Sequence, residues 1–100
     1  MGFVEVCSLE ELKTDRKKAV NIGKDTIALF YLDGKVYAIN GICAHKGGPL
    51  CEGQFDDQEI ICPWHGFMYN VKTGICLNHP GFSVRKFKTK VDGEKVFVEV

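Results

Sequence analysis

The chain has 100 residues, of which 45% are hydrophobic and 26% charged, and its 13 basic and 13 acidic side chains give a formal net charge of +0. This apolar content excludes a disordered chain, and the balanced charge argues against nucleic-acid and membrane-surface proteins, which usually carry a basic excess. The longest apolar run, residues 27–32, is far too short to span a membrane, and no signal segment opens the sequence. We therefore expect a soluble cytoplasmic protein that binds neither membrane nor nucleic acid.

The first part of the sequence predicts short strands around one helical turn. Residues 3–7 alternate weakly as an opening strand, and Ser8 followed by Glu11 has the spacing of a capping box. The charged stretch 13–18 is expected to be a solvated surface bend. Asp33-Gly34 is a hairpin signal between two apolar segments. The strands expected before the first cysteine motif are 19–22, 26–32 and 35–39.

Most strands expected later in the chain are also short, and they are joined by glycine turns. Asp92-Gly93 predicts a second hairpin, between one long strand over 82–91 and a last strand over 95–100. Many short strands with almost no helix predict an all-β fold, either an antiparallel β-sandwich or a partly open barrel. We expect one domain over residues 1–100, in which approximately residues 41–79 project as a subdomain of two loops.

Two short motifs carry the chemistry of this sequence. Cys43 and His45 form a C-x-H motif, and Cys62 and His65 form a C-x-x-H motif after a further sixteen residues. We call residues 43–51 the first knuckle and residues 62–67 the second knuckle. Each knuckle offers one thiolate and one imidazole, so the two loops together can hold a metal centre.

The spacing leaves two kinds of centre open. One is a single tetrahedral zinc, which would make the chain a zinc-stabilised interaction module without a redox role. The other is a two-iron, two-sulfide cluster with cysteine on one iron and histidine on the other. Common zinc fingers put both cysteines in one knuckle, whereas each knuckle is mixed here. This mixing favours the cluster, with Cys43 and Cys62 on the inner iron and His45 and His65 on the outer one.

The sequence resembles the Rieske [2Fe–2S] family, whose signature is C-x-H, fifteen to seventeen residues, and C-x-x-H. The likeness extends through Gly-Pro-Leu at 48–50, Cys-Pro-Trp-His-Gly-Phe at 62–67 and Thr-Gly at 73–74. The respiratory-complex branch of that family carries a disulfide between the loops, and Gly48 and Trp64 stand at those positions here. That branch also places a serine and a tyrosine hydroxyl near the sulfurs, where this chain has Phe67 and Tyr69. The chain is therefore more similar to the soluble oxygenase ferredoxins and to the small subunit of nitrite reductases.

The resemblance implies a soluble electron carrier with one [2Fe–2S] cluster, and not an enzyme. A flavoprotein or ferredoxin reductase would be the electron donor, and an oxygenase or a nitrite-reductase-type enzyme the acceptor. A second possibility that the resemblance leaves open is a small subunit bound permanently to a reductase. The sequence itself shows no Ser-His-Asp order, phosphate loop or paired acids that would indicate catalysis.

Several reactive side chains are expected to be bystanders. Cys7 and Cys76 lie in predicted strands as small apolar residues, and Cys51 and His79 are expected not to be ligands. Trp64 is expected to be exposed on a docking surface, because it lies between two proposed ligands. We expect an apolar rim beside Trp64, formed by Pro49, Leu50 and Phe67, although Phe67 could instead pack inward. We also expect an acidic run near the site, at Glu52, Asp56, Asp57 and Glu59.

Overall fold

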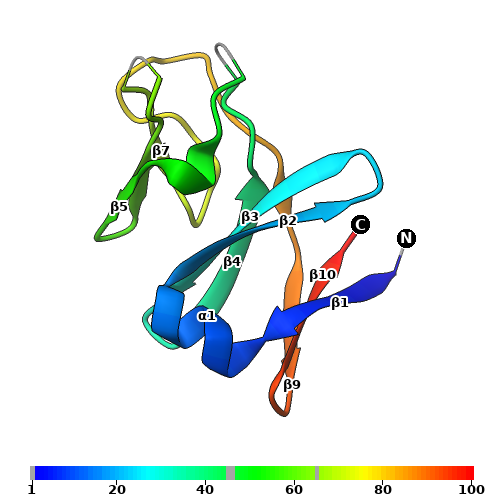
Figure 1. The fold of residues 1–100 in the computed structure, drawn as a ribbon. Helices are drawn as coiled ribbons and strands as arrows, with labels where there is room; N and C mark the ends of the chain where they lie inside the picture. Colours follow the sequence, from blue (N-terminus) through cyan, green and yellow to red (C-terminus); the bar gives the residue numbers. More distant parts are fainter. Residues whose placement is uncertain (1, 45–46, 65) are drawn as a thin grey trace.

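The computed structural model describes residues 2–44, 47–64 and 66–100, and its strands form three antiparallel sheets (Figure 1). Two sheets, β2-β3-β4-β8 and β1-β10-β9, form the base of the molecule. The third sheet, β5-β6-β7, projects from one end of the base together with the knuckles. The predicted all-β fold is confirmed. The elements are β1 (Phe3–Ser8), α1 (Leu9–Asp15), β2 (Lys17–Ile22), β3 (Asp25–Leu32), β4 (Lys35–Asn40), η1 (Leu50–Glu52), β5 (Gln54–Asp56), β6 (Glu59–Ile61), β7 (Met68–Asn70), β8 (Lys86–Phe87), β9 (Thr89–Asp92) and β10 (Lys95–Glu99).

Strand β3 is buried on both faces and divides its side chains between two cores. Ile27 and Leu29 enter a core shared with α1, β8 and β10, which holds the two base sheets together. Ala28 and Phe30 enter a second core that reaches into the projecting unit and includes both Cys43 and Cys62. A strand buried on both faces reads as a continuous apolar run, and residues 27–32 are such a run. The knuckles are therefore packed directly onto the central strand of the base.

The β3–β4 hairpin delivers the chain to the first knuckle. Asp33 and Gly34 have φ angles of 52° and 78°, as a two-residue type I′ turn requires, so this predicted hairpin is confirmed. The turn pairs Leu32 with Lys35, and the register continues until Ile27 pairs with Asn40 at the end of β4. Three residues later the chain reaches the first proposed ligand.

The predicted cap of α1 is confirmed, but the predicted bend after it is wrong. The Ser8 hydroxyl accepts a hydrogen bond of 3.1 Å from the Glu11 amide. The helix then runs on to Asp15, and β2 starts at Lys17, so residues 13–18 contain helix and strand. The chain turns within a single residue, because Arg16 adopts a left-handed conformation with φ 68°. Lys17 consequently points across the molecule instead of into solvent.

The single long strand predicted over 82–91 is also wrong. β8 pairs with β4, whereas β9 pairs with β10, so the chain changes from one base sheet to the other between them. Before β8, residues 82–84 run beside residues 74–76 of the projecting unit. The Cys76 amide donates to the Phe82 carbonyl at 3.0 Å, and the Val84 amide donates to the Gly74 carbonyl at 2.8 Å. Alternation in the sequence gives no sign of which sheet each residue joins.

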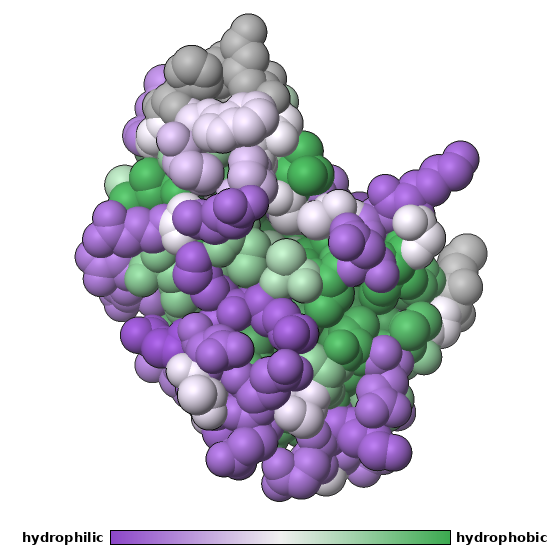
Figure 2. Space-filling model, viewed as in Figure 1, coloured by the Kyte–Doolittle hydropathy of each residue, from purple (hydrophilic) through white to green (hydrophobic). Residues whose placement is uncertain are grey.

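The surface seen in Figure 2 is largely hydrophilic over the base, with a hydrophobic area beside the two chain ends marked in Figure 1. Phe3 and Val4, at the start of β1, are among the large hydrophobic residues that are exposed. Among the described residues, no helix has the length and apolar character needed to cross a bilayer.

Candidate metal centre

The first knuckle closes on itself through backbone hydrogen bonds. The Cys43 amide donates to the Gly48 carbonyl at 2.8 Å, and the Gly47 amide donates back to the Cys43 carbonyl at 3.0 Å. Gly47 has a φ of 75°, a left-handed conformation that glycine adopts without strain. After the loop, the Leu50 amide donates to the Gly41 carbonyl at 2.8 Å, and the Leu50 side chain is fully buried. The loop is thus anchored at its base on both sides.

The second knuckle is a tight connection between β6 and β7. Ile61 pairs with Met68 in the sheet, so residues 62–67 must reverse the chain direction. The Cys62 amide donates to the Phe67 carbonyl at 2.7 Å, which closes the loop, and Gly66 has a φ of 71°. In Figure 1 both knuckles lie at the same end of the molecule.

The two knuckles bring Cys43 and Cys62 together in the protein interior. Their exposed fractions are 3% and 2%. The pKa of the Cys62 thiol is raised above its ordinary value, first by burial and then by the Cys43 side chain, which shares a hydrogen bond with it. A hydrogen bond from the Trp64 amide to the Cys62 Sγ, at 3.4 Å, acts in the opposite direction. Two adjacent buried thiols are costly to ionise, which a bound cation would reverse.

Tyr69, on β7, places its hydroxyl beside the Cys43 sulfur. The phenol oxygen lies 3.3 Å from Cys43 Sγ and accepts a hydrogen bond of 3.1 Å from the Ala44 amide. Because the Ala44 N–H already donates to this oxygen, the hydroxyl proton is available for the sulfur. The pKa of Tyr69 is strongly raised, mainly by burial and next by its hydrogen bond with Cys43, so the phenol stays protonated. The tyrosine position inferred from the resemblance therefore lies where a donor to a thiolate is needed.

Gly48 and Trp64, which stand where the respiratory branch has its disulfide, face each other across the two loops. A Cβ atom on Gly48 would lie 3.1 Å from two indole carbons of Trp64 and only 2.7 Å from Cys62 Sγ. The indole therefore packs directly over the backbone of the first knuckle. The five cysteines, all within the described residues, form no disulfide. In this chain a ring packed on a glycine joins the loops in place of a covalent bond.

The expected apolar rim is only partly present. Trp64 is 49% exposed, in agreement with the prediction, but Leu50 is buried. Phe67 is buried too, as in the inward alternative, and its ring stacks on His79 with centroids 3.8 Å apart. Phe82 packs edge-on against the same ring at 5.2 Å. Phe67 thus belongs to an aromatic group beneath the second knuckle.

The other cysteines lie in ordinary packing positions. Cys76 is buried, and its thiol donates to Asn78 Oδ1 at 3.4 Å. Cys7 and Cys51 are half-buried, and burial is the main cause that raises the pKa of each thiol. The proposed ligands His45 and His65 lie outside the described residues.

Sequence reasoning missed two side chains that support the knuckles from a distance. Lys17 donates to the carbonyl oxygens of Cys51 and Gly53, at 2.6 and 2.7 Å, and so caps the C-terminal end of η1. Asn78 contacts the second knuckle through its side-chain amide. Nothing in the sequence indicates the partners of Lys17, because they lie 34 and 36 residues further along the chain. An asparagine two residues before Pro80 suggests a turn, but not a contact with another loop.

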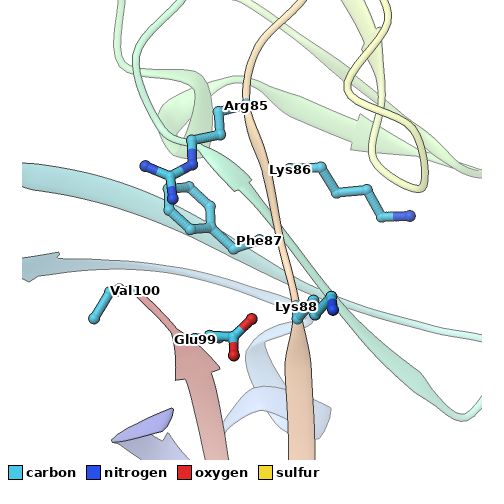
Figure 3. A pocket seen from close by; sticks show the side chains of 6 residues that line it. All are labelled: Arg85, Lys86, Phe87, Lys88, Glu99 and Val100. Carbon is cyan, nitrogen blue, oxygen red and sulfur yellow. The ribbon is translucent and has the colours of Figure 1, made fainter. Parts of the chain in front are cut away.

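The base carries a shallow pocket of ≈ 300 Å³ that includes no residue of either knuckle. In Figure 3 the Arg85 guanidinium lies over the Phe87 ring, 4.5 Å from its centroid, whereas Lys86 extends to the other side of the strand. Lys88 and Glu99 also line the pocket. The lining consists of three cationic side chains, one carboxylate and two apolar side chains. This pocket is a surface hollow outside the metal centre.

The described part of the metal centre fits an iron–sulfur cluster. It supplies two adjacent sulfurs shielded from water, a hydroxyl and an amide within reach of them, and a first loop that passes too close to the sulfur for any side chain. Hydrogen bonds to sulfur and exclusion of water are the features that tune such centres.

Comparison with known proteins identifies the family. The Rieske [2Fe-2S] domain matches residues 2–88. Human apoptosis-inducing factor 3 is 34% identical over 94 residues, which are 93% of this chain but only 16% of that protein. The chain thus spans about a sixth of the length of that curated relative.

Among solved structures, the ferredoxin of carbazole 1,9a-dioxygenase from Nocardioides aromaticivorans IC177 is 31% identical, with a TM-score of 0.89. The match covers 98% of this chain and 97% of that one. A chain in a complex of reduced oxygenase and oxidized ferredoxin of carbazole 1,9a-dioxygenase is 28% identical, with a TM-score of 0.88, over 96% of this chain and 91% of that one. Matches of this extent remove the zinc interpretation, and the chain belongs to the Rieske [2Fe–2S] family, whose cofactor is one [2Fe–2S] cluster.

Proposed function

We propose that this chain is a one-electron carrier that receives electrons from a reductase and passes them to an oxygenase. The observation that carries the proposal is the pair of adjacent buried sulfurs, Cys43 and Cys62, in a chain of this family. The similarity to a ferredoxin found in complex with its oxygenase supports an oxygenase as the acceptor. A flavoprotein or ferredoxin reductase fits as the donor, and a nitrite-reductase-type enzyme is the alternative acceptor. We place the carrier in the cytoplasm, since no disulfide links any of its five cysteines.

The proposed ligands are Cys43 and Cys62 on one iron and His45 and His65 on the other. The two sulfurs are supplied by different loops, which supports a centre held between the knuckles, and the motif spacing supports the two histidines. On this proposal, approximately residues 41–79 are the cluster-binding subdomain of a single domain over residues 1–100. When bound, a cluster with two histidine ligands takes up and releases one electron at about −150 to +300 mV.

The protein's contribution is to hold the sulfurs dry and oriented. Burial of Cys43 and Cys62 excludes water, so few solvent molecules must reorient when the charge changes. The Tyr69 hydroxyl and the Trp64 amide donate toward the two sulfurs and favour the more negative, reduced state. Packing holds the Tyr69 hydroxyl and the backbone holds the Trp64 amide, so neither donor has to reorient when the centre is reduced.

The surface around the knuckles offers a place for a partner. Trp64 is half-exposed and adjacent to a proposed ligand, so a docked protein would contact the loops that hold the centre. Aromatic residues of this kind are enriched in binding hot spots. In the projecting unit, acidic side chains on η1 and on the β5–β6 hairpin would steer a basic partner by long-range attraction. The acidic residues are Glu52, Asp56, Asp57 and Glu59.

Spectra of cysteine variants test the proposal. Cys43→Ser and Cys62→Ser are expected to abolish the visible absorption of the protein together with its bound iron and sulfide. Cys51→Ser and Cys76→Ser are matched controls from the same subdomain and should keep the spectrum. A Cys62→Ser protein with a normal visible spectrum would contradict the ligand assignment.

Reduction experiments test the carrier role separately. The iron-loaded protein should take up one electron per molecule from a reductase and return it when an oxidised Rieske oxygenase is added. A protein that purifies only with a large partner would instead be a permanent subunit. A colourless protein with bound zinc would contradict the proposal outright.

A further inference from the structure

A short segment after β7 runs alongside the exit of the second knuckle. The Leu77 amide donates to the Met68 carbonyl at 2.7 Å, and the Cys76 amide donates to the Phe82 carbonyl at 3.0 Å. Residues 76–82 therefore form a closed loop, which we call the clasp loop. It is attached to the first residue of β7, immediately after the second knuckle ends.

Asn78, in the middle of the clasp loop, grips the knuckle with its side-chain amide. Its Nδ2 donates to the Gly66 carbonyl at 3.0 Å, and its Oδ1 accepts from the Met68 amide at 3.0 Å. Gly66 and Met68 flank Phe67, so one side chain holds the backbone on both sides of that residue. The donor end faces a carbonyl and the acceptor end faces an N–H, which leaves a single chemically sensible orientation of the amide.

The aromatic group strengthens the same connection. The His79 ring lies nearly parallel to the Phe67 ring, at an interplanar angle of 11°, and Phe82 closes the group from the other end of the clasp loop. The carbonyl of Phe67 accepts the 2.7 Å hydrogen bond from the Cys62 amide. A continuous path of contacts therefore leads from Asn78, through Phe67, to the backbone of Cys62.

We infer that Asn78 is a positioning residue for the centre, because it fixes the exit of the second knuckle and thereby the placement of Cys62. The inference rests on the proposed assignment of Cys62 and His65 as ligands. Loss of the grip lets the loop open, which admits water to the sulfurs and lengthens the Trp64 N–H contact to Cys62 Sγ. The centre is then lost faster and has a lower reduction potential, because a donor to sulfur favours the reduced state.

The test replaces Asn78 with leucine, which keeps a similar volume and removes every side-chain hydrogen bond. The matched control is Asn70→Leu, since Asn70 lies on β7 of the same unit and its Oδ1 accepts a local hydrogen bond of 2.8 Å from the Lys72 amide. The intermediate variant Asn78→Asp keeps the acceptor for the Met68 amide and loses the donor to Gly66. The iron-loaded proteins are compared by amide hydrogen exchange of peptides within residues 62–68, by the rate of bleaching with an iron chelator, and by midpoint potential.

Asn78→Leu should accelerate exchange in residues 62–68 and chelator bleaching by about tenfold each, the size expected when an opening equilibrium loses one to two hydrogen bonds. Its potential should fall, and Asn78→Asp should show an intermediate increase in exchange. Asn70→Leu should change none of the three readouts, even if its melting temperature falls equally.

Unchanged exchange in Asn78→Leu would overturn the inference, and so would faster exchange without faster bleaching. If Asn78→Leu does not fold, the exchange of Asn78→Asp decides in the same way. Failure of the ligand assignment is seen elsewhere, in the spectrum of Cys62→Ser, where Asn78 is intact.

Discussion

Replacing Gly48 with alanine adds one methyl group where the two knuckles meet. The new Cβ would lie 2.7 Å from Cys62 Sγ and 3.1 Å from two ring carbons of Trp64. Gly48 is not in the left-handed region, so alanine can adopt its backbone conformation and the effect is steric. The substitution therefore measures how closely the first knuckle approaches the sulfur.

The two contacts differ in how easily they yield. The Trp64 ring is half-exposed and can swing outward, whereas the Cys62 sulfur is buried. If Cys62 is an iron ligand, as proposed, its sulfur cannot move without straining the metal bond. Overpacking of one methyl group costs about 1–3 kcal/mol. We expect Gly48→Ala to lower the free energy of unfolding of the iron-loaded protein by about 2 kcal/mol and to speed chelator bleaching.

A double-mutant cycle with Trp64→Ala separates the two contacts. If the sulfur contact dominates, removing the ring should restore less than half of the lost stability in urea unfolding. Gly2→Ala is the control, since a Cβ there meets nothing within 4 Å. A Gly48→Ala protein with wild-type stability and bleaching rate would refute the reasoning, and full recovery in the Trp64→Ala background would place the constraint on the ring instead.

Three further predictions follow from the supports of the site. Tyr69→Phe removes the hydroxyl near Cys43 Sγ and should lower the midpoint potential by about 30–60 mV, which corresponds to half the energy of a charge-assisted hydrogen bond. The visible spectrum should not change, and film voltammetry showing no shift would mean that the hydroxyl does not donate to sulfur. Lys17→Met leaves the carbonyls of Cys51 and Gly53 without their donor and should cost about 1–3 kcal/mol in urea unfolding; no loss would mean that water replaces the ammonium group. Excess thiol reductant followed by reoxidation should leave cluster content equal to that of an untreated sample, because no disulfide joins the knuckles, and substantial loss would point to a cysteine pair.

The sequence predicts those features whose cause is local. The Asp33-Gly34 turn needs positive φ at both residues, and the Ser8 cap needs a hydroxyl three residues before an amide, so a few adjacent letters suffice. The knuckles are equally local, since the C-x-H and C-x-x-H spacings place the proposed ligands on single loops. The exposed position of Trp64 follows from its place between two such ligands.

The features that the sequence could not predict depend on distant partners. Lys17 lies in a charged stretch typical of a solvated bend, and its partners are carbonyls of η1 and its C-cap, 34 and 36 residues away. The interruption between β8 and β9 marks a change of sheet that strand alternation does not record. Asn78 likewise acts through the backbone of a loop 10 to 12 residues away, and any polar residue before a proline would look the same.

The antiparallel pairing of β1 with β10 has a consequence for how this fold can be built into larger proteins. Phe3 pairs with Glu99, and the Val100 amide donates to the Gly2 carbonyl at 3.2 Å. Residues 2 and 100 are therefore neighbours on the surface of the fold. In Figure 1 this part of the surface is on the base, away from the end that carries the knuckles. A further domain can therefore be joined at either end, or this one inserted into a host loop, without threading a linker past the redox end. The same unit can thus serve as a module in chains of very different length.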